Sequence, residues 1–214
     1  MDRKSTPVTY SVHPGVATVQ RWVATLKEAT GRALDEWIAL VKADGPPTET
    51  GRRAWLVSEH DLSANSARWI AERCEEKGPG DDDPASYLRT AVEWVDEMYA
   101  GKKAALRPVH DALLRSALAL GGDVRACPCK TIVPLYRRYV FAQIKPTTNT
   151  RIDLGLALRD TPVSGRLVDT GGFVKKDRIS HRIAVSRIEE IDAELLGWLQ
   201  AAYDLDAVAT TDDD

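Results

Sequence analysis

The hydrophobic period of this chain changes after Gly121-Gly122, and that change limits the folds open to the chain. Before this pair, apolar residues recur every three or four positions, which is typical of amphipathic helices. After it, short segments alternate instead, most clearly from Ile152 to Leu158, where each leucine or isoleucine is followed by a polar or small residue. Such alternation predicts a strand with one buried and one polar face. We therefore expect an α+β chain: a small helical bundle, then an α+β domain whose antiparallel sheet packs on helices.

The individual elements follow from the same patterns. Turn residues such as Gly31 and the run Asp44-Gly45-Pro46-Pro47 end the helical stripes, and Ser63 is a candidate N-cap. Expected helices cover residues 16–31, 34–44, 49–59, 63–74, 87–98, 106–120 and 188–205. Expected strands cover residues 131–136, 139–144, 151–158 and 181–186.

A linker is expected between the two domains. Residues 77–84 contain two glycines, two prolines and three adjacent aspartates, a composition that cannot sustain a helix. We divide the chain into an N-terminal tail (1–14), a helical domain (15–77), a linker (78–85), an α+β domain (86–206) and an acidic tail (207–214).

Composition excludes several classes of protein. The longest apolar run, residues 112–120, is interrupted by Arg115 and is too short for a membrane span. The first ten residues lack the apolar core of a secretory signal, so we expect a cytoplasmic protein. Three cysteines are an odd number and do not form a disulfide framework. Cys127 and Cys129 are spaced C-x-C, which is not a zinc-ribbon spacing, so we expect no metal and no cofactor.

The charge of the chain is unevenly distributed. Residues 124–188 contain 13 Lys and Arg against 4 Asp and Glu, a net charge of +9, whereas the rest of the chain carries −12. A basic segment rich in strand patterns within an acidic protein predicts a surface that meets anions. No catalytic motif accompanies this segment: a nucleophile elbow, a phosphate-binding Gly-Lys loop and a zinc-protease motif are all missing from the sequence. We therefore favour a binding protein over an enzyme.

The candidate anion-binding residues lie on or beside the expected strands. Arg grips phosphate or carboxylate with two donors, and Lys supplies a point charge. Residues 146–151 form a turn rich in hydroxyl and amide groups, which can donate to the same anions. Arg151 and Arg159 occupy alternate positions of the expected strand 151–158 and its end, so we expect their side chains on the face opposite the leucines. The predicted set is Lys130, Arg137, Arg138, Lys145, Thr147, Thr148, Arg151 and His181.

Several partners remain open at this stage. Tyr136 and Tyr139 alternate with arginines, as in proteins that stack single-stranded nucleic acid, and nucleic acid is the leading expectation. A small phosphorylated or carboxylated ligand, bound or acted on by the protein, is the first alternative, and a protein–protein adaptor is the second. The arginines can also simply pair with the acidic helices. Residues 171–178 are either a flexible lid over the basic face or an ordinary surface loop.

A helix-turn-helix is a further alternative in the N-terminal part. Two short helices flank the turn His60-Asp61-Leu62, but the second helix offers only Arg68 and Arg73 as cations. Any small helical bundle has the same pattern. We therefore place the expected anion contacts in the C-terminal part of the chain.

Two sets of motifs carry a family resemblance. Residues 31–41 (GRALDEWIALV) and 54–62 (AWLVSEHDL) resemble a short helical bacterial domain of unknown function, numbered 4287. Six further segments resemble a second domain of unknown function, numbered 5655. They are residues 99–108 (YAGKKAALRP), 129–131 (CKT), 141–148 (FAQIKPTT), 150–158 (TRIDLGLAL), 180–182 (SHR) and 192–203. Together the two resemblances cover roughly residues 15–77 and 98–205, and they imply the same two-domain division. They imply no defined activity. The second domain also occurs beside nuclease-like or restriction-associated modules, which implies a link to nucleic acids by association.

Overall fold

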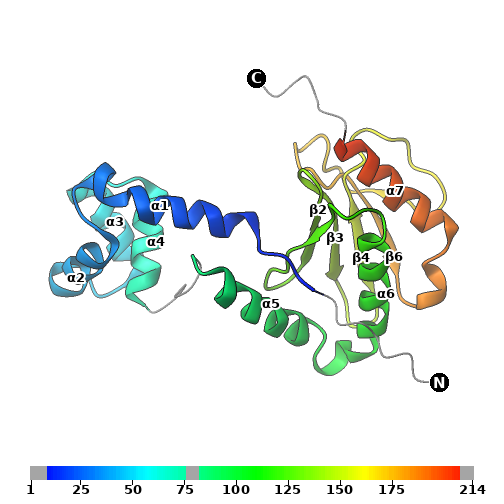
Figure 1. The fold of residues 1–214 in the computed structure, drawn as a ribbon, viewed down its shortest axis with the longest axis horizontal. Coiled ribbons are helices and arrows are strands. Elements are labelled where there is room, and N and C mark those ends of the chain that lie inside the picture. The colour runs from blue at the N-terminus through cyan, green and yellow to red at the C-terminus, as the bar shows by residue number, and fades with distance from the viewer. Residues whose placement is uncertain (1–8, 76–81, 208–214) are drawn as a thin grey trace. The chain divides into compact units, whose positions relative to one another are not determined.

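The computed structural model describes residues 9–75 and 82–207, which form two compact units (Figure 1). One unit runs from Val12 to Tyr87, and the other combines residues 9–11 with residues 88–207. Residues 78–81 of the expected linker, residues 208–214 of the expected acidic tail and residues 1–8 of the expected N-terminal tail lie outside the described residues. None of the described helices is long and apolar enough to cross a membrane.

The first unit is helical, as the sequence predicts. Its helices are α1 (Pro14–Thr30), α2 (Leu34–Asp44), α3 (Glu49–His60) and α4 (Ala64–Cys74). Gly31 ends α1 with a φ of 79°, a left-handed conformation that glycine adopts without steric cost. The expected N-cap of α4 is confirmed, because the Ser63 hydroxyl accepts a hydrogen bond from the backbone N–H of Ser66 at 3.2 Å. Trp37, Leu56 and Ile70 are fully buried at the centre of this bundle.

The second unit contains an antiparallel six-stranded sheet in the order β1-β2-β3-β4-β6-β5. The α+β fold class is therefore confirmed. The strands are β1 (Arg125–Ala126), β2 (Val133–Tyr136), β3 (Val140–Pro146), β4 (Ile152–Leu156), β5 (Val168–Asp169) and β6 (His181–Val185). The helices are α5 (Pro84–Met98), which begins in the first unit, η1 (Gly101–Leu106), α6 (Arg107–Leu118), η2 (Ile188–Glu190) and α7 (Ala193–Ala207).

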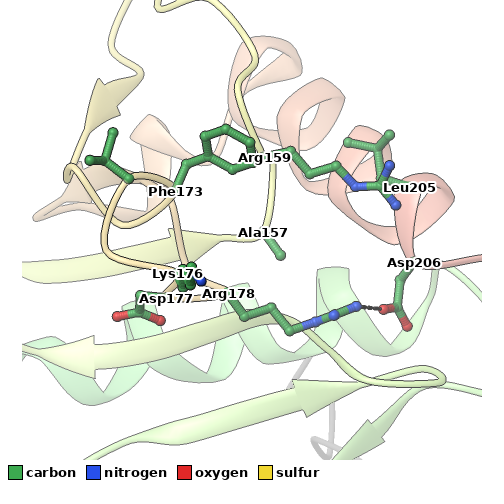
Figure 2. A pocket seen from close by; sticks show the side chains of 9 residues that line it. Ala157, Arg159, Phe173, Lys176, Asp177, Arg178, Leu205 and Asp206 are labelled. Atoms are coloured by element: carbon green, nitrogen blue, oxygen red, sulfur yellow. Dashed lines mark hydrogen bonds and ion pairs between the residues drawn. The ribbon is translucent and has the colours of Figure 1, made fainter. Parts of the chain in front are cut away.

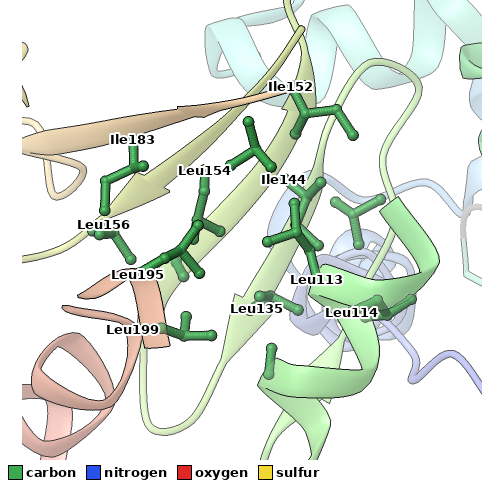
Figure 3. Packing of buried hydrophobic residues seen from close by; sticks show 14 of the residues in the cluster. Leu113, Leu114, Leu135, Ile144, Ile152, Leu154, Leu156, Ile183, Leu195 and Leu199 are labelled. Atoms are coloured by element: carbon green, nitrogen blue, oxygen red, sulfur yellow. The ribbon is translucent and has the colours of Figure 1, made fainter. Parts of the chain in front are cut away.

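One face of the sheet is covered by α6 and α7 (Figure 3). Register places Ile144 beside Leu154 and Leu154 beside Ile183, so that a row of apolar side chains crosses three strands. Leu113 of α6 and Leu199 of α7 pack on this row and are almost fully buried. The alternation in β4 thus assigned the faces correctly, since Leu154 and Leu156 are at most 1% exposed.

The opposite face of the sheet is polar. Gln143 and Lys145 of β3 pair in register with Gly155 and Asp153 of β4. Gln143, Lys145 and Asp153 are partly or fully exposed between buried neighbours, whereas Gly155 is buried. A Cβ atom at Gly155 would lie 2.8 Å from the Cγ2 atom of Ile179, so the chain just after residues 171–178 packs closely over this position. The rest of the face, around Lys145, lacks such a cover, because Lys145 is exposed.

Three expectations about the elements were wrong. The third predicted strand ends at Leu156 rather than Leu158, and Arg159 lies beyond it with a φ of 55°. Strand parity therefore says nothing about where Arg159 points. The predicted closing helix from 188 to 205 is interrupted: η2 ends at Glu190 and α7 begins at Ala193. The two-residue strands β1 and β5 were missed, because two residues cannot show an alternating pattern.

Candidate anion-binding site

The predicted residues do not form one site, because β3 separates them. Arg137 and Arg138 lie just before β3 begins at Val140, whereas Thr147 and Thr148 follow its end at Pro146. A seven-residue strand rising about 3.3 Å per residue puts these groups roughly 20 Å apart. The predicted set therefore divides between the two ends of one strand.

A hollow of about 400 Å³ lies at the end of β3. Lys102 and Lys103 of η1 line it together with Lys130, which follows β1, and Asn149 of the β3–β4 turn. The Nζ atom of Lys103 donates a hydrogen bond to the carbonyl oxygen of Pro146 at 2.9 Å, which ties η1 to this turn. We call this site the lysine hollow; its remaining lining residues are Glu97, Met98, Ala100, Thr131 and Pro146.

The lysines of this hollow are available to a partner. Lys102 and Lys130 are exposed, and neither makes an ion pair with any residue in the described part of the chain. Glu97 is the one acidic residue among those that line the hollow. Lys145, exposed and also without an ion pair among the described residues, directly precedes Pro146. The end of β3 thus carries an excess of positive charge that the unit does not neutralise.

Arg151 and Thr147 are engaged with the sheet itself. The Arg151 Nε atom lies 2.9 Å from the Oδ1 atom of Asp153, and the Thr147 hydroxyl donates to Oδ2 at 2.9 Å. Arg182 of β6 approaches the same carboxylate at 3.4 Å. The Thr148 hydroxyl accepts a hydrogen bond from the backbone N–H of Thr150 at 3.3 Å, which stabilises the turn. Arg151 and Thr147 therefore build the turn beside the lysine hollow rather than its cationic lining.

Arg137 and Arg138 lie at the other end of β3. The Arg137 Nε atom donates to Asp123 at 2.8 Å, and its guanidinium lies 3.9 Å from the centre of the Tyr203 ring. The pKa of the Asp123 carboxyl is lowered because it accepts hydrogen bonds from the Tyr203 hydroxyl and from Arg137. The Arg138 side chain lies over the ring of Tyr139 at 5.3 Å. The contacts of Arg137 are thus made within the protein, to Asp123 and Tyr203.

His181 belongs with neither group. Its side chain is 2% exposed, and its Nδ1 atom lies 2.8 Å from the Ser180 hydroxyl oxygen. In register it lies beside Leu156, on the face that α6 and α7 cover. His181 was predicted to contact an anion, but its burial keeps it from any partner in solvent.

Several basic residues pair with acidic residues of the closing helix region. Arg166 contacts Asp192 and Glu194, and Arg178 contacts Asp206. Internal pairing therefore neutralises part of the basic segment, as one of the alternatives predicted. Within residues 124–188, the cations without an ion pair to any described residue are Arg125, Lys130, Arg138, Lys145, Arg159, Lys175 and Lys176.

Cys127 and Cys129 show no sign of reactivity. Burial raises the pKa of the Cys127 thiol to about 11 and also raises that of Cys129, so both are protonated at neutral pH. Among the described residues, no cluster of three His, Cys, Asp or Glu side chains has an arrangement that would hold a metal ion.

The comparisons with known proteins identify the two regions. A family model described as a domain of unknown function (DUF5655) matches residues 95–206, which is more than half of the chain. The chain belongs to the DUF5655 family. A second model, also described as a domain of unknown function (DUF4287), matches residues 18–75. No curated protein and no solved structure matches the chain.

The lysine hollow lies entirely within the DUF5655 region. In the DUF4287 region, by contrast, the cations of α4 are engaged: Arg68 pairs with Glu72, and Arg73 lies over Trp22 at 5.3 Å. Sequence reasoning missed Lys102 and Lys103, because they lie between the expected helices 87–98 and 106–120 and outside the basic segment 124–188. The signal was available in the Gly101-Lys-Lys sequence, where glycine breaks the helix before two adjacent cations.

Proposed function

We propose that the lysine hollow binds phosphate groups of a nucleic acid backbone. The observation that carries this proposal is the convergence of Lys102 and Lys130, two exposed lysines from separate segments, without an ion pair to any described residue. Asn149 and Thr131 add an amide and a hydroxyl donor beside them. Lysine ammonium groups are point charges that suit phosphates presented in varied geometries.

The chemistry of the hollow favours the backbone over the bases. No aromatic residue lines it, so it offers no ring on which an unpaired base would stack. Tyr139, the exposed tyrosine expected to stack bases, lies at the other end of β3 under the guanidinium groups of Arg138 and Arg178. Contacts to phosphates alone carry no sequence information, so the proposed partner is duplex nucleic acid bound without sequence preference.

The charge of the rest of the protein sets the expected strength of binding. The whole chain has a net charge of −3, and acidic residues outside the basic segment repel a polyanion. We expect dissociation constants near the range of non-specific binding, about 10⁻⁴ to 10⁻⁶ M at physiological salt. A cytoplasmic location is part of this proposal, because the three cysteines are thiols rather than disulfides and nucleic acid is available there.

The proposal is tested by the salt dependence of binding. A fluorescent duplex is titrated with the full-length protein at several salt concentrations, using the wild type, Lys130→Ala and Lys42→Ala. Each phosphate contact contributes about −0.9 to the slope of log K against log salt, so Lys130→Ala should lower the affinity and reduce the slope by about one. Lys42, an exposed lysine of α2, is the matched control that removes the same charge elsewhere, and its variant should keep the wild-type slope.

Two results would contradict the proposal. One is a wild-type protein that binds no duplex even at low salt. The other is an equal loss of affinity in Lys130→Ala and Lys42→Ala, which would mean that overall charge rather than the lysine hollow determines binding.

A further inference from the structure

A second cavity, of about 510 Å³, lies at the opposite end of β3 from the lysine hollow (Figure 2). Three segments form it: Ala157 and Arg159 after β4, the loop of residues 171–178, and Leu205 and Asp206 near the end of α7. This volume is within the range of pockets that hold small organic ligands, which is about 300–1,000 Å³. We call it the loop pocket.

One part of its wall is apolar. Ala157 and Leu205 line the pocket together with Phe173 and Val174 of the loop. Phe173 is 53% exposed and Val174 is 87% exposed, so two large apolar side chains face solvent beside a cavity. Burying them against an apolar ligand body would be favourable, because apolar surface would leave water.

The rest of the wall is charged, with cations in excess over carboxylates. Arg159 and Lys176 line the pocket, and neither makes an ion pair with a described residue. Figure 2 shows the Arg159 side chain extending across the pocket toward Leu205. A guanidinium can hold a carboxylate or phosphate through two parallel hydrogen bonds, which gives directed recognition of an anion.

Both acidic residues of the pocket accept hydrogen bonds from the protein itself. Asp206 is 4% exposed and accepts hydrogen bonds from the backbone N–H groups of Arg138 at 2.8 Å and Tyr139 at 2.9 Å. Arg178 pairs with the other oxygen of Asp206 (Figure 2). Its Nε atom donates to the carbonyl oxygen of Val140 at 2.8 Å. Asp177 accepts from the backbone N–H of Ile179 at 3.1 Å. These contacts hold the loop in place. The pocket is lined by three cations (Arg159, Lys176 and Arg178) and two carboxylates (Asp177 and Asp206), so its lining keeps a net charge of +1.

The backbone at both free cations is unusual. Arg159 has a φ of 55° and Lys176 a φ of 58°, and Asp61 is the one other non-glycine residue with positive φ in the described chain. This left-handed region is unfavourable for residues with a Cβ atom, and such residues concentrate at ligand-binding sites. Two of the three thus lie at one pocket, and both carry the positive side chains that line it.

We propose that the loop pocket binds a small organic anion: a carboxylate or phosphate carried on an aromatic or aliphatic body. Arg159 and Lys176 hold the anionic group, and Phe173, Val174 and Leu205 cover the apolar body. Arg178 and Asp206 act as positioning residues, because they fix the loop without presenting free charge. This site is independent of the lysine hollow and of any nucleic acid bound there.

The proposal is tested with phenyl phosphate, inorganic phosphate and phenol as probes. Binding to the full-length protein is measured by displacement of anilinonaphthalene sulfonate, an aromatic anion that fluoresces in apolar sites. Phenyl phosphate should displace the dye at a lower concentration than either inorganic phosphate or phenol, because only phenyl phosphate uses both parts of the wall. Equal displacement by inorganic phosphate would overturn the role of the apolar wall, and equal displacement by phenol would overturn that of the cations.

The key variant is Arg159→Gly, which removes the guanidinium and suits the positive φ. It should weaken phenyl phosphate binding by about tenfold or more, the effect expected from loss of a charge-assisted hydrogen bond. Its melting temperature should not fall, so that lost binding cannot be attributed to unfolding. Lys176→Gly should act in the same direction for the same reason. Lys175→Ala is the matched control, since Lys175 lies on the same loop but does not line the pocket.

Three outcomes would overturn the proposal. The first is no displacement of the dye by phenyl phosphate from the wild type. The second is unchanged binding in both Arg159→Gly and Lys176→Gly. The third is loss of binding in Lys130→Ala with full binding in Arg159→Gly, which would move the anion to the lysine hollow. Duplex binding by Arg159→Gly should equal that of the wild type, so this test and that of the lysine hollow can fail separately.

Discussion

The two ends of β3 carry positive charge in different forms. At its start, the cations are mostly arginines: Arg137, Arg138, Arg159 and Arg178, with Lys176 beside them. At its end, they are mostly lysines: Lys102, Lys103, Lys130 and Lys145. Arginine forms planar, directed pairs, whereas lysine is a flexible and strongly hydrated point charge.

The cations at the two ends of β3 also differ in what they contact. Arg137 and Arg178 at the start of β3 pair with Asp123 and Asp206, so much of their charge holds a turn, a loop and a helix end together. Lys102 and Lys130 at the other end contact no acidic partner among the described residues. The positive charge of residues 124–188 therefore divides between two local environments, and Lys102 and Lys103 add to one of them. A count of charges along the chain cannot distinguish the two.

The largest difference between the two ends should appear in stability. Asp206→Ala removes a buried carboxylate that accepts from two backbone N–H groups and from Arg178, and it should lower the free energy of unfolding by about 3 kcal/mol. Glu97→Ala at the lysine hollow removes an exposed carboxylate and should change it by less than about 0.5 kcal/mol. Urea-induced unfolding followed by circular dichroism measures both. Similar effects from the two changes would mean that the ends are not organised differently.

Acid should lower the free energy of unfolding through a buried histidine in the core. His110 of α6 is fully buried, its ring lies 4.7 Å from that of Tyr99, and neither ring nitrogen has a hydrogen-bond partner in the described structure. Burial is the main cause that lowers the pKa of His110 to about 4, with Asp111 opposing the shift and Arg107 adding to it. The unfolded chain, with a histidine pKa near 6.5, therefore binds a proton before the folded chain does as pH falls.

The stability contributed by neutral His110 is present at neutral pH and is lost as pH falls from about 6.5 toward 4. Between pH 7 and pH 5 the free energy of unfolding should fall by about 2 kcal/mol from this residue. His110→Leu removes the titrating group, so its stability should depend less on pH in that window. An identical pH dependence in the variant and the wild type would show that His110 is not the group responsible.

The sequence predicted the elements well where a pattern was long. The strict alternation around Leu154 and Leu156 identified β4 and its buried face, and apolar stripes located the seven α-helices found among the described residues. The end of β4 was misplaced because Leu158 continues the alternation and is buried after the strand has ended. Burial outside a strand produces the same pattern as burial within it.

The sites were less predictable because they depend on contacts between distant segments. Lys130 and the 146–151 turn were predicted to meet an anion, but Lys102 and Lys103 join them only through the packing of η1 against Pro146. The loop pocket combines Arg159, Lys176 and Leu205, whose segments share no local period. The burial of His181 was not predictable, because a histidine among strand residues has the same sequence signature whether it faces solvent or the core.

The most direct measurement is a competition between the two kinds of ligand on one protein. A fluorescent duplex is titrated with the full-length protein in the absence and then in the presence of saturating phenyl phosphate, at constant ionic strength. Because the two sites lie roughly 20 Å apart at opposite ends of β3, the dissociation constant for the duplex should change by less than about twofold. Displacement of the duplex in proportion to the phenyl phosphate added would contradict two separate sites and show that both anions bind to one.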